Sequence, residues 1–454
     1  MVVSRRSVLR AGTGIALTGL AAACGSGQNP GSPSQRAPAP DARTDLPDDN
    51  SGPATDVWDR IRSDFNLDTD FIHMSAMLLA SHPAPVRNAI AEHRNGLDRN
   101  PVIYLEEHMR PGLSAAREAI ATYLGTRTDR IALTNSTTNA VGITYNGLVL
   151  VPGDEVLTTE QDYYVTFEAL RQMTSRYGAI VRTVPLYDRP PTLTEEEAVA
   201  RILSGVSNAT RLVALTWVHS STGYKLPVHA ITSAIADLNA SRPASRQILV
   251  GIDGVHGFGV EDFELSDLGC DFFMSGCHKW LFGPRGTGFI AAGSKGYEML
   301  VPSVPSFIEN GGAFDAWILD DDEVRDNNAE RMTPGGFQAF EHKLAVPAAV
   351  AWQMEIGKAA VADRTHALAS QLKEGLASIP GVTVHTPLDR AFSAGIVSFD
   401  IEGQSARETV ERLRHHRIIA SAAPYAVPHA RLTPSIRNSP SEIEAVLRRV
   451  REIA

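Results

Sequence analysis

From about Arg130 onward, short apolar runs of strand length alternate with longer segments of helical spacing. The apolar runs are 130–136, 155–159, 179–186, 211–218, 248–253, 271–276 and 288–293. Residues 163–178 have helical spacing and end at Gly178, a residue type favoured where helices stop. Strands that alternate with helices indicate βαβ units, and hence a mostly parallel sheet with both faces covered. The pattern therefore predicts an α/β fold.

The pattern changes after about Pro334. It predicts one long helical stretch over 343–379, then the strand-like runs PGVTVHT and GIVSFDI, a helix over about 405–416 and a last helix in SEIEAVLRRVREIA. This order indicates a smaller α+β domain. The predicted divisions of the folded chain are an N-terminal segment at 56–110, a large domain at 111–333 and a small C-terminal domain at 334–454.

The first residues, MVVSRRSVLRAGTGIALTGLAAACGSG, carry paired arginines and then an apolar run. That run is too short to span a bilayer, so residues 1–23 are predicted to be a targeting segment. SRRSVLR resembles the twin-arginine export signal of bacteria, and an ordinary secretory signal is the alternative. AAAC, ending at Cys24, resembles a lipoprotein processing site, with the usual leucine displaced to Leu20. Residues 24–55 read as a flexible linker, so we expect an exported, periplasmic or cell-surface protein, lipid-anchored if Cys24 is acylated.

Composition and charge narrow the class of protein. With 43% hydrophobic and 21% charged residues, the 454-residue chain has the make-up of a globular protein with a large core. Its net charge of −10 argues against nucleic acid as a partner. Besides Cys24, the chain has only Cys270 and Cys277, so no disulfide framework is expected. No Cys/His spacing resembles a zinc site, and no metal is predicted.

Two charged residues stand where predicted buried strands end. Lys279, in SGCHKWLFGPRGTG, follows the run 271–276, and Asp253 closes the run ILVGID. A buried ammonium group is costly unless it is paired or neutralised, although Lys279 can also be an exposed residue at a strand end. Asp253 either caps a helix or faces a cationic group of a ligand.

Two further features accompany them at strand ends. TNSTTN, at 134–139, lies between a strand and a helix start, where hydroxyls and backbone N–H groups form either an anion site or an ordinary helix cap. Tyr163 begins the next βα element and is either a core aromatic or a cover for a flat ligand. Together these features offer a phosphate cradle, an aromatic lid, a carboxylate and an amine. That set fits pyridoxal phosphate.

Three motifs occur in order along the chain: TNSTTNA, VGIDGVHGFG and SGCHKWLFGPRGTG. With them the chain, from about residue 72 to the C-terminus, resembles the class-V aminotransferase family of pyridoxal-phosphate enzymes. Within that family it is most similar to the isopenicillin-N epimerase-like branch. The resemblance implies fold type I, with a mostly parallel, seven-stranded sheet in the large domain and a smaller α+β domain.

The resemblance also implies roles for the residues of these motifs. Lys279 forms the Schiff base with the cofactor and becomes the general base once a substrate amine displaces it. Asp253 pairs with the pyridinium nitrogen and keeps it protonated. Thr137 and Thr138 hold the phosphate at a helix N-terminus, and His278 donates a hydrogen bond to it.

Other positions match the family less directly. Ser220 matches the residue that contacts the ring hydroxyl, a match that can slip by one residue to His219 or Ser221. His256 matches a position that faces the cofactor, with a core histidine as the alternative. Tyr163 stands where many relatives have a stacking histidine, and a phenol cannot shuttle protons near neutral pH as imidazole can. This difference leaves the type of reaction open.

The C-terminal third supplies the remaining matches. Thr333 matches a threonine that reaches the phosphate of a neighbouring subunit, which implies a homodimer. Arg431 matches the arginine that receives the substrate carboxylate, with a surface arginine as the alternative. Cysteine desulfurases of this family need a nucleophilic cysteine before that arginine. Residues 418–429 contain none and Cys277 is on the wrong loop, so this activity is not expected.

The resemblance thus predicts an enzyme that acts at the α-carbon of an amino acid or an amino-acid derivative, as an epimerase, a lyase or an aminotransferase. The alternative is an exported lipoprotein that binds pyridoxal phosphate without catalysis. Retention of Lys279, Asp253 and Arg431 together favours the enzyme. The partners expected are a small-molecule substrate and a second copy of the chain.

Overall fold

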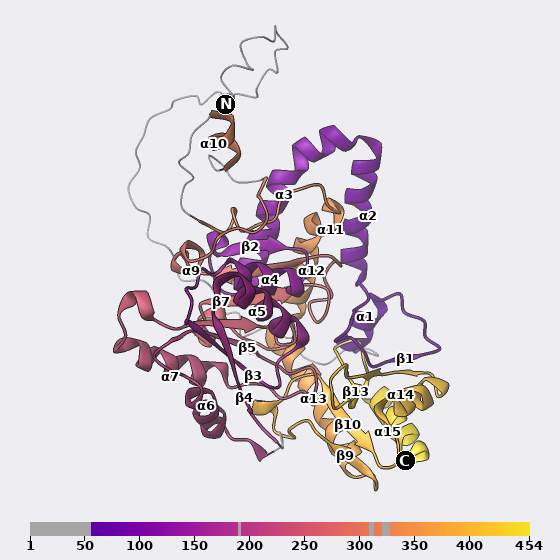
Figure 1. Cartoon of the computed structure of the whole chain (residues 1–454). Coiled ribbons are helices and arrows are strands. Elements are labelled where there is room, and N and C mark those ends of the chain that lie inside the picture. The colour runs from indigo at the N-terminus through magenta and orange to yellow at the C-terminus, as the bar shows by residue number, and fades with distance from the viewer. Residues whose placement is uncertain (1–55, 189–191, 308–312, 320–326) are drawn as a thin grey trace, which may run out of the picture. The chain divides into compact units, whose positions relative to one another are not determined.

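A computed structural model describes residues 56–188, 192–307, 313–319 and 327–454 (Figure 1). The predicted signal at 1–23 and linker at 24–55 lie outside the described residues. Within these ranges, no helix has both the length and the apolar character required to cross a bilayer.

A seven-stranded sheet forms the centre of the large domain, with the strand order β2-β8-β7-β6-β5-β3-β4. Its strands are β2 (Ile131–Thr134), β3 (Glu155–Thr159), β4 (Ile180–Val184), β5 (Thr210–Thr216), β6 (Leu249–Asp253), β7 (Phe272–Gly276) and β8 (Gly288–Ala292). Strands β3 to β7 are parallel, which confirms the predicted α/β fold. β8 runs antiparallel to β2 and β7, because the short connection from β7 contains no crossover helix.

Helices cover both faces of this sheet, and alternate residues of each strand enter two separate cores. One core joins Val156 and Met274 to helices α4 (Thr137–Gly147) and α5 (Tyr164–Tyr177). The other joins Leu157 to helices on the opposite face. Those helices are α3 (Pro101–Tyr123), α6 (Glu195–Ser204), α7 (Val228–Ala240) and α12 (Val346–Ile356), with α8 (Leu265–Leu268) at the rim. As predicted, α5 ends at Gly178, which has the positive φ of 68°.

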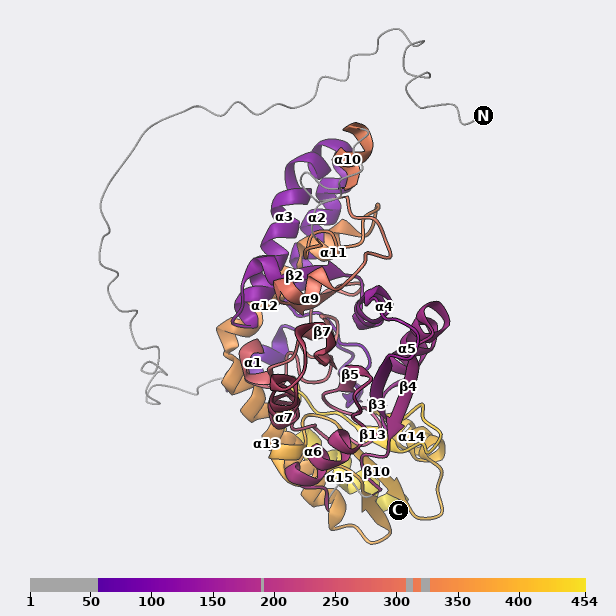
Figure 2. The ribbon, with the colours of Figure 1, turned by 60° about the vertical axis from the view of Figure 1, so that its left-hand side comes forward.

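The N-terminal segment contributes to several parts of the fold. After α1 (Val57–Ser63), helices α2 (Ala84–Arg99) and α3 lie side by side in both views (Figures 1 and 2). The division predicted between residues 110 and 111 falls inside α3, so this helix continues across it. β1 (Ile72–His73) pairs in parallel with β11 (Ile418–Ile419), a pairing that links the two ends of the chain and was not predicted.

A second, antiparallel sheet in the C-terminal region has the order β12-β13-β10-β9. Its strands are β9 (Val382–Val384), β10 (Val397–Ile401), β12 (Ser421–Ala422) and β13 (Ala430–Leu432). Phe399 and its neighbours at alternate positions of β10 pack against α13 (Lys358–Ala377), α14 (Ala406–His415) and α15 (Pro440–Ile453). Side chains such as Ser398 and Arg431 occupy the opposite face of this sheet and make hydrogen bonds to residues 220 and 221. The second face therefore meets the large domain.

The single long helix predicted over 343–379 is wrong. The segment forms α11 (Phe340–Leu344), α12 and α13. Pro347 in the first turn of α12 lacks the N–H that would continue α11. Gly357 between α12 and α13 has a φ of 92°, which interrupts helical geometry. The remaining short helices are α9 (Ser294–Glu298) and α10 (Ala313–Leu319).

Candidate active site

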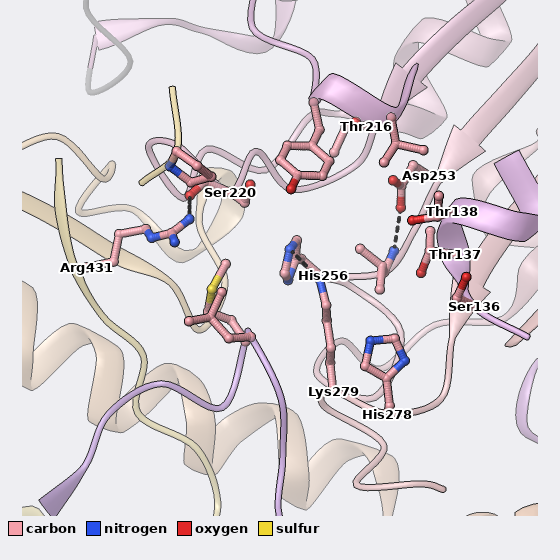
Figure 3. Close-up of a pocket in the computed structure, with 16 residues that line it drawn as sticks. Ser136, Thr137, Thr138, Thr216, Ser220, Asp253, His256, His278, Lys279 and Arg431 are labelled. Atoms are coloured by element: carbon pink, nitrogen blue, oxygen red, sulfur yellow. Dashed lines mark hydrogen bonds between the residues drawn. The ribbon is translucent and has the colours of Figure 1, made fainter. Parts of the chain in front are cut away.

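A cavity of about 220 Å³ lies where β5, β6 and β7 end, between the seven-stranded sheet and β13 (Figure 3). Its lining residues are Met77, Leu78, Ser136, Thr137, Thr138, Tyr163, Val165, Thr216, Ser220, Asp253, Val255, His256, His278, Lys279, Pro424 and Arg431. The carboxyl ends of parallel strands are the usual ligand site of such sheets. The fold therefore brings together residues that are far apart in the sequence.

Lys279 and Asp253 are the central charged groups. Burial lowers the pKa of Lys279 to about 8, against the opposing effect of Asp253. Burial raises the pKa of Asp253 to about 6, although the Val255 amide and Lys279 act in the other direction. One Asp253 oxygen accepts a hydrogen bond from the Val255 N–H at 3.1 Å, which orients the carboxyl group. A buried carboxyl group held in this way is suited to pair with a cationic ring nitrogen.

An anion cradle lies at the start of α4. Ser136 caps this helix by accepting a hydrogen bond from the Asn139 N–H at 3.1 Å. Beside it, Oγ1 of Thr137 and Nδ1 of His278 are buried and have no hydrogen-bond partner among the described residues. A Cβ atom on Gly276 would lie 3.0 Å from Thr137 Oγ1 and 2.8 Å from the His278 ring, so the glycine keeps this space open. These unsatisfied groups at a helix N-terminus fit a phosphate.

His256 packs directly against the lysine. Its Nε2 lies 3.3 Å from Lys279 Nζ, and its Nδ1 accepts a hydrogen bond from the Trp280 indole N–H at 3.2 Å. Burial and the charges of Lys279 and Arg431 hold the pKa of His256 well below its usual value. Burial and Lys279 likewise lower the pKa of His278 to about 4. Both imidazoles are therefore neutral at physiological pH.

The structure separates the three candidates for the ring-hydroxyl contact. Ser220 lines the cavity, and its Oγ lies 2.8 Å from the hydroxyl of Tyr425. His219 points away and makes a 2.8 Å hydrogen bond with Tyr187, and burial lowers its pKa to about 3. Neither His219 nor Ser221 is among the lining residues. Only Ser220 is in a position to make the contact.

Arg431 comes from β13 and lies on the opposite side of the cavity from Thr137 and Thr138 (Figure 3). It is 1% exposed and donates hydrogen bonds to the Ser220 carbonyl at 2.7 Å and to the Ala422 carbonyl at 3.0 Å. Burial lowers its pKa to about 10, so it remains charged at neutral pH. A phosphate at one end and a carboxylate at the other would have Lys279 between them.

Tyr425 is not among the residues that the sequence predicts for the site, because its loop has no regular pattern and matches no motif. The ring of Tyr425 lies 5.9 Å from that of Tyr163, centroid to centroid, and burial raises the pKa of its hydroxyl. Tyr163 itself lines the cavity at the start of α5, as the match implied. The two phenols therefore stand together beside Ser220.

Thr333 does not line this cavity. It is 3% exposed, and its hydroxyl accepts a hydrogen bond from Leu133 N–H at 3.1 Å and donates one to the Ala329 carbonyl at 2.9 Å. It lines a separate, mainly apolar cavity of about 100 Å³ together with Phe337 and Lys343. Its role toward a second subunit stays a prediction.

Cys277 and Cys270 also lie outside the Lys279 cavity. Cys277 is fully buried, and burial raises the pKa of each thiol to about 12. A thiol of such high pKa is almost entirely protonated at neutral pH, whereas the nucleophilic form is the thiolate. Neither cysteine is placed or ionised for catalysis in this cavity.

This arrangement of lysine, carboxylate and anion cradle at the strand ends defines a pyridoxal-phosphate enzyme of fold type I. The chain belongs to the class-V aminotransferase family, whose model matches residues 80–435. Pyridoxal 5′-phosphate is the cofactor of this family, whose members act on small-molecule amino-acid substrates. The predicted family, fold and cofactor are therefore confirmed.

Several known proteins are similar to the chain. It is 27% identical to the isopenicillin N epimerase of Streptomyces clavuligerus over 403 residues, covering 85% of this chain and 96% of the relative. The epimerase of Amycolatopsis lactamdurans is also 27% identical, over 76% of this chain and 84% of the relative. A cysteine desulfurase of Pectobacterium atrosepticum is 23% identical, over 82% of this chain and 91% of the relative.

Solved structures share the fold. A mutant of C-DES with glycine covalently linked to its PLP cofactor superposes with a TM-score of 0.77 at 21% identity, over 86% of this chain and 99% of that chain. A cysteine desulfurase from Thermococcus onnurineus gives a TM-score of 0.74 at 19% identity, over 87% of this chain and 97% of that chain. At this level of identity the likeness establishes the fold.

Proposed function

We propose that this chain epimerises an amino acid or an amino-acid derivative, with Lys279 removing the α-proton on one face and a tyrosine returning a proton on the other. The observation that carries the proposal is the placement of Lys279, Asp253 and Arg431 around one cavity. The similarity to two isopenicillin N epimerases supports this choice within the family.

Three residues and one helix N-terminus fit the tasks of holding the cofactor. Thr137, His278 and the N-terminus of α4 would bind its phosphate through groups that otherwise lack partners. Asp253 would bind its ring nitrogen, and that contact would favour the ionised carboxylate. When bound, pyridoxal 5′-phosphate links to the substrate amine and withdraws electrons from the α-carbon.

Lys279 is suited to act as the base. With a pKa of about 8, roughly a tenth of its amine is unprotonated at pH 7, whereas an ordinary lysine is almost entirely charged. A base works best when its pKa lies near the operating pH. Nε2 of His256, 3.3 Å away, holds the amine in place.

Arg431 would orient the substrate by its carboxylate. The guanidinium is planar and presents paired N–H donors that match the two carboxylate oxygens. Its hydrogen bonds to the carbonyls of Ser220 and Ala422 hold it in place, and its five N–H groups leave further donors for a carboxylate. Its location opposite the anion cradle leaves the substrate's α-carbon near Lys279 (Figure 3).

The proton for the second face is assigned to the phenol pair of Tyr425 and Tyr163. Tyr163 lines the cavity, whereas Tyr425 lies just outside it, with its hydroxyl 2.8 Å from Ser220 Oγ. Burial raises the pKa of Tyr425, so its hydroxyl stays protonated throughout the physiological range but is a weaker acid than an ordinary phenol. A lyase would need only Lys279, so the paired phenols are the feature that favours epimerisation over elimination.

Deuterium exchange tests the reaction. The cofactor-loaded protein is incubated with a panel of L-amino acids, peptide-like derivatives and cysteine conjugates in deuterated water. Deuterium at the α-carbon with inversion supports the proposal. Release of pyruvate and ammonia would instead identify a lyase, and a pyridoxamine spectrum an aminotransferase.

Variants separate an enzyme from a binding protein. Lys279→Ala should abolish exchange and borohydride fixation of the cofactor, whereas Lys295→Ala, at an exposed lysine, should retain both. If the unmodified chain holds the cofactor but exchanges no α-proton, it is a binding protein without catalysis. A cysteine desulfurase is not proposed, because neither described cysteine reaches the cavity.

A further inference from the structure

A second cluster of potential ligands lies outside the cofactor cavity. Nε2 of His385 and Nδ1 of His429 lie 2.7 Å and 2.8 Å from the same oxygen, Oδ2 of Asp400. All three atoms lie within 4.8 Å of one another. The two imidazole rings are 3.9 Å apart, centroid to centroid, at an angle of 31°. Two imidazole nitrogens and one carboxylate oxygen thus converge on one point.

The antiparallel sheet creates this convergence. β10 and β13 are antiparallel, and Phe399 pairs with Ala430. The next position along this register places Asp400 opposite His429. The His385 N–H donates to the Ser398 carbonyl at 2.9 Å, which places His385 beside β10 two residues before Asp400. Because side chains alternate along a strand, all three point to the same face, opposite the Phe399 core. Asp400 therefore lies in β10, and the two histidines lie one residue beyond the ends of the neighbouring strands β9 and β13.

The chemistry of the cluster suits a metal ion. Two imidazole nitrogens and one carboxylate oxygen are ligand types that Zn²⁺ takes in proteins, and three protein ligands with a water in the fourth position are a common set.

The dimensions also fit. Zn²⁺ takes histidine nitrogen and carboxylate oxygen at about 2.0–2.1 Å, so ligand atoms around a tetrahedral ion lie about 3.3 Å apart. The nitrogens need to move away from Oδ2 by only about half an ångström to admit it. The side chains of His385, His429 and Asp400 are 24%, 12% and 36% exposed, so an ion and a water ligand can reach them.

We propose that His385, Asp400 and His429 bind one divalent transition-metal ion of the Zn²⁺ class, with an open fourth position. His429 closes the loop that follows β12 and carries Pro424 and Tyr425, two residues beside the cofactor cavity. Two residues further, β13 presents Arg431. The ion would tie the end of this loop to β9 and β10, and so steady one wall of the cavity.

Zinc titration of the cofactor-loaded, tag-free chain tests the proposal. After removal of metal by a chelator, Zn²⁺ is added in competition with a chromogenic chelator, and one tightly bound ion per chain is expected. His385→Gln, Asp400→Asn and His429→Gln should each weaken binding by at least about tenfold, as loss of a metal contact does. His415→Gln, at an exposed histidine of α14, is the matched control and should bind as the unmodified chain.

X-ray absorption on the unmodified chain gives a measurement that needs no variant. The expected spectrum shows scattering from two imidazole rings, with nitrogen and oxygen ligands at about 2.0–2.2 Å from the metal. Absence of saturable binding at micromolar Zn²⁺ would overturn the proposal, as would binding unaffected by the His385→Gln/His429→Gln double variant. Retained cofactor absorbance and an unchanged thermal midpoint without metal show that the variants are folded.

Discussion

Nζ of Lys279 lies 3.3 Å from Nε2 of His256, on the side of the ring opposite the Trp280 contact. An indole N–H can only donate, so Nδ1 of His256 is the acceptor and carries no proton. With its pKa well below the usual value, His256 is neutral and its single proton sits on Nε2. That N–H finds an acceptor in Lys279 only when the amine is unprotonated. The pair therefore favours the reactive form of the lysine.

Attachment of the cofactor should depend on pH in a specific way. Burial places the pKa of Lys279 near 8, below the ordinary value of 10.5, so the neutral amine appears as pH rises through 8. Roughly a tenth of the amine is neutral at pH 7 and roughly nine tenths at pH 9. When pyridoxal phosphate is added to cofactor-free protein, the rate at which borohydride fixes the cofactor to Lys279 should rise over this interval. A rise centred near the ordinary lysine value would contradict the assigned environment.

His256→Phe probes the same relationship. Loss of one neutral hydrogen bond of about 1 kcal/mol should move the midpoint of this rise upward by less than about one pH unit. Trp280→Phe should act in the same direction, because it frees Nδ1 to take the proton. An unchanged midpoint in both variants would show that burial alone sets the pKa of Lys279.

Gly276→Ala should weaken cofactor binding. The added Cβ would lie 2.8 Å from the His278 ring and 3.0 Å from Thr137 Oγ1, in the space assigned to the phosphate. Overpacking of about 1–3 kcal/mol corresponds to a loss of about 5- to 150-fold in affinity. Gly293→Ala is the control, since its Cβ meets nothing within 4 Å. Fluorescence titration with pyridoxal phosphate measures both, and equal affinities would place the phosphate elsewhere.

Tyr425→Phe should slow epimerisation far more than it slows exchange of the α-proton. Epimerisation should slow by about 10²- to 10⁴-fold, the usual contribution of a general acid. Exchange of the α-proton through Lys279, followed by NMR in deuterated water, should change far less. Tyr164→Phe, at a tyrosine that is 67% exposed, should leave both rates unchanged. If Tyr163→Phe has the effect expected of Tyr425→Phe, the donor is Tyr163.

Thr333→Val should destabilise the chain. It removes the acceptor of the Leu133 N–H in a buried place, at a cost of about 1–3 kcal/mol in urea unfolding. If Thr333 also reaches a neighbouring subunit's phosphate, the variant should bind the cofactor more weakly, and Thr333→Ser should restore affinity. Sedimentation should then report a homodimer. Unaltered affinity in Thr333→Val would assign the residue to folding alone.

Export can be tested at the paired arginines. Replacing Arg5 and Arg6 together by lysine should leave a folded, cofactor-loaded precursor inside the cell, because the twin-arginine route requires both guanidinium groups. Cell fractionation and absorbance of the retained protein measure this. Unchanged export would mean that an ordinary secretory signal is present.

The strands and the central site residues were predictable because their signals are local. Each apolar run has strand length; Asp253 is the last residue of one, and Lys279 comes three residues after the end of another. Parallel strands end at a common edge, so residues that follow them in sequence must meet in space. Thr137, His256 and Arg431 were placed in the cavity by resemblance and are found there.

Other features depend on contacts between distant segments. No local pattern connects β1 to β11, which pair in a separate two-stranded sheet. No local pattern connects His385 to Asp400 and His429 either, because they meet through strand register in the four-stranded sheet, and their spacing in the sequence is not that of a zinc motif. The break at Gly357 was overlooked, since the apolar periodicity on each side of it is helical. Tyr425 was overlooked because its loop has no regular pattern.

Arg431 connects two parts of the chain through its hydrogen bonds. Its hydrogen bonds join β13 to Ser220 of the large domain and to Ala422 of β12. The guanidinium has five N–H groups, so a ligand carboxylate can pair with donors that these two hydrogen bonds leave over. The protein therefore holds the group that recognises an acid in place before any ligand arrives. Arg431→Lys should weaken the binding of acidic ligands far more than that of amines and esters.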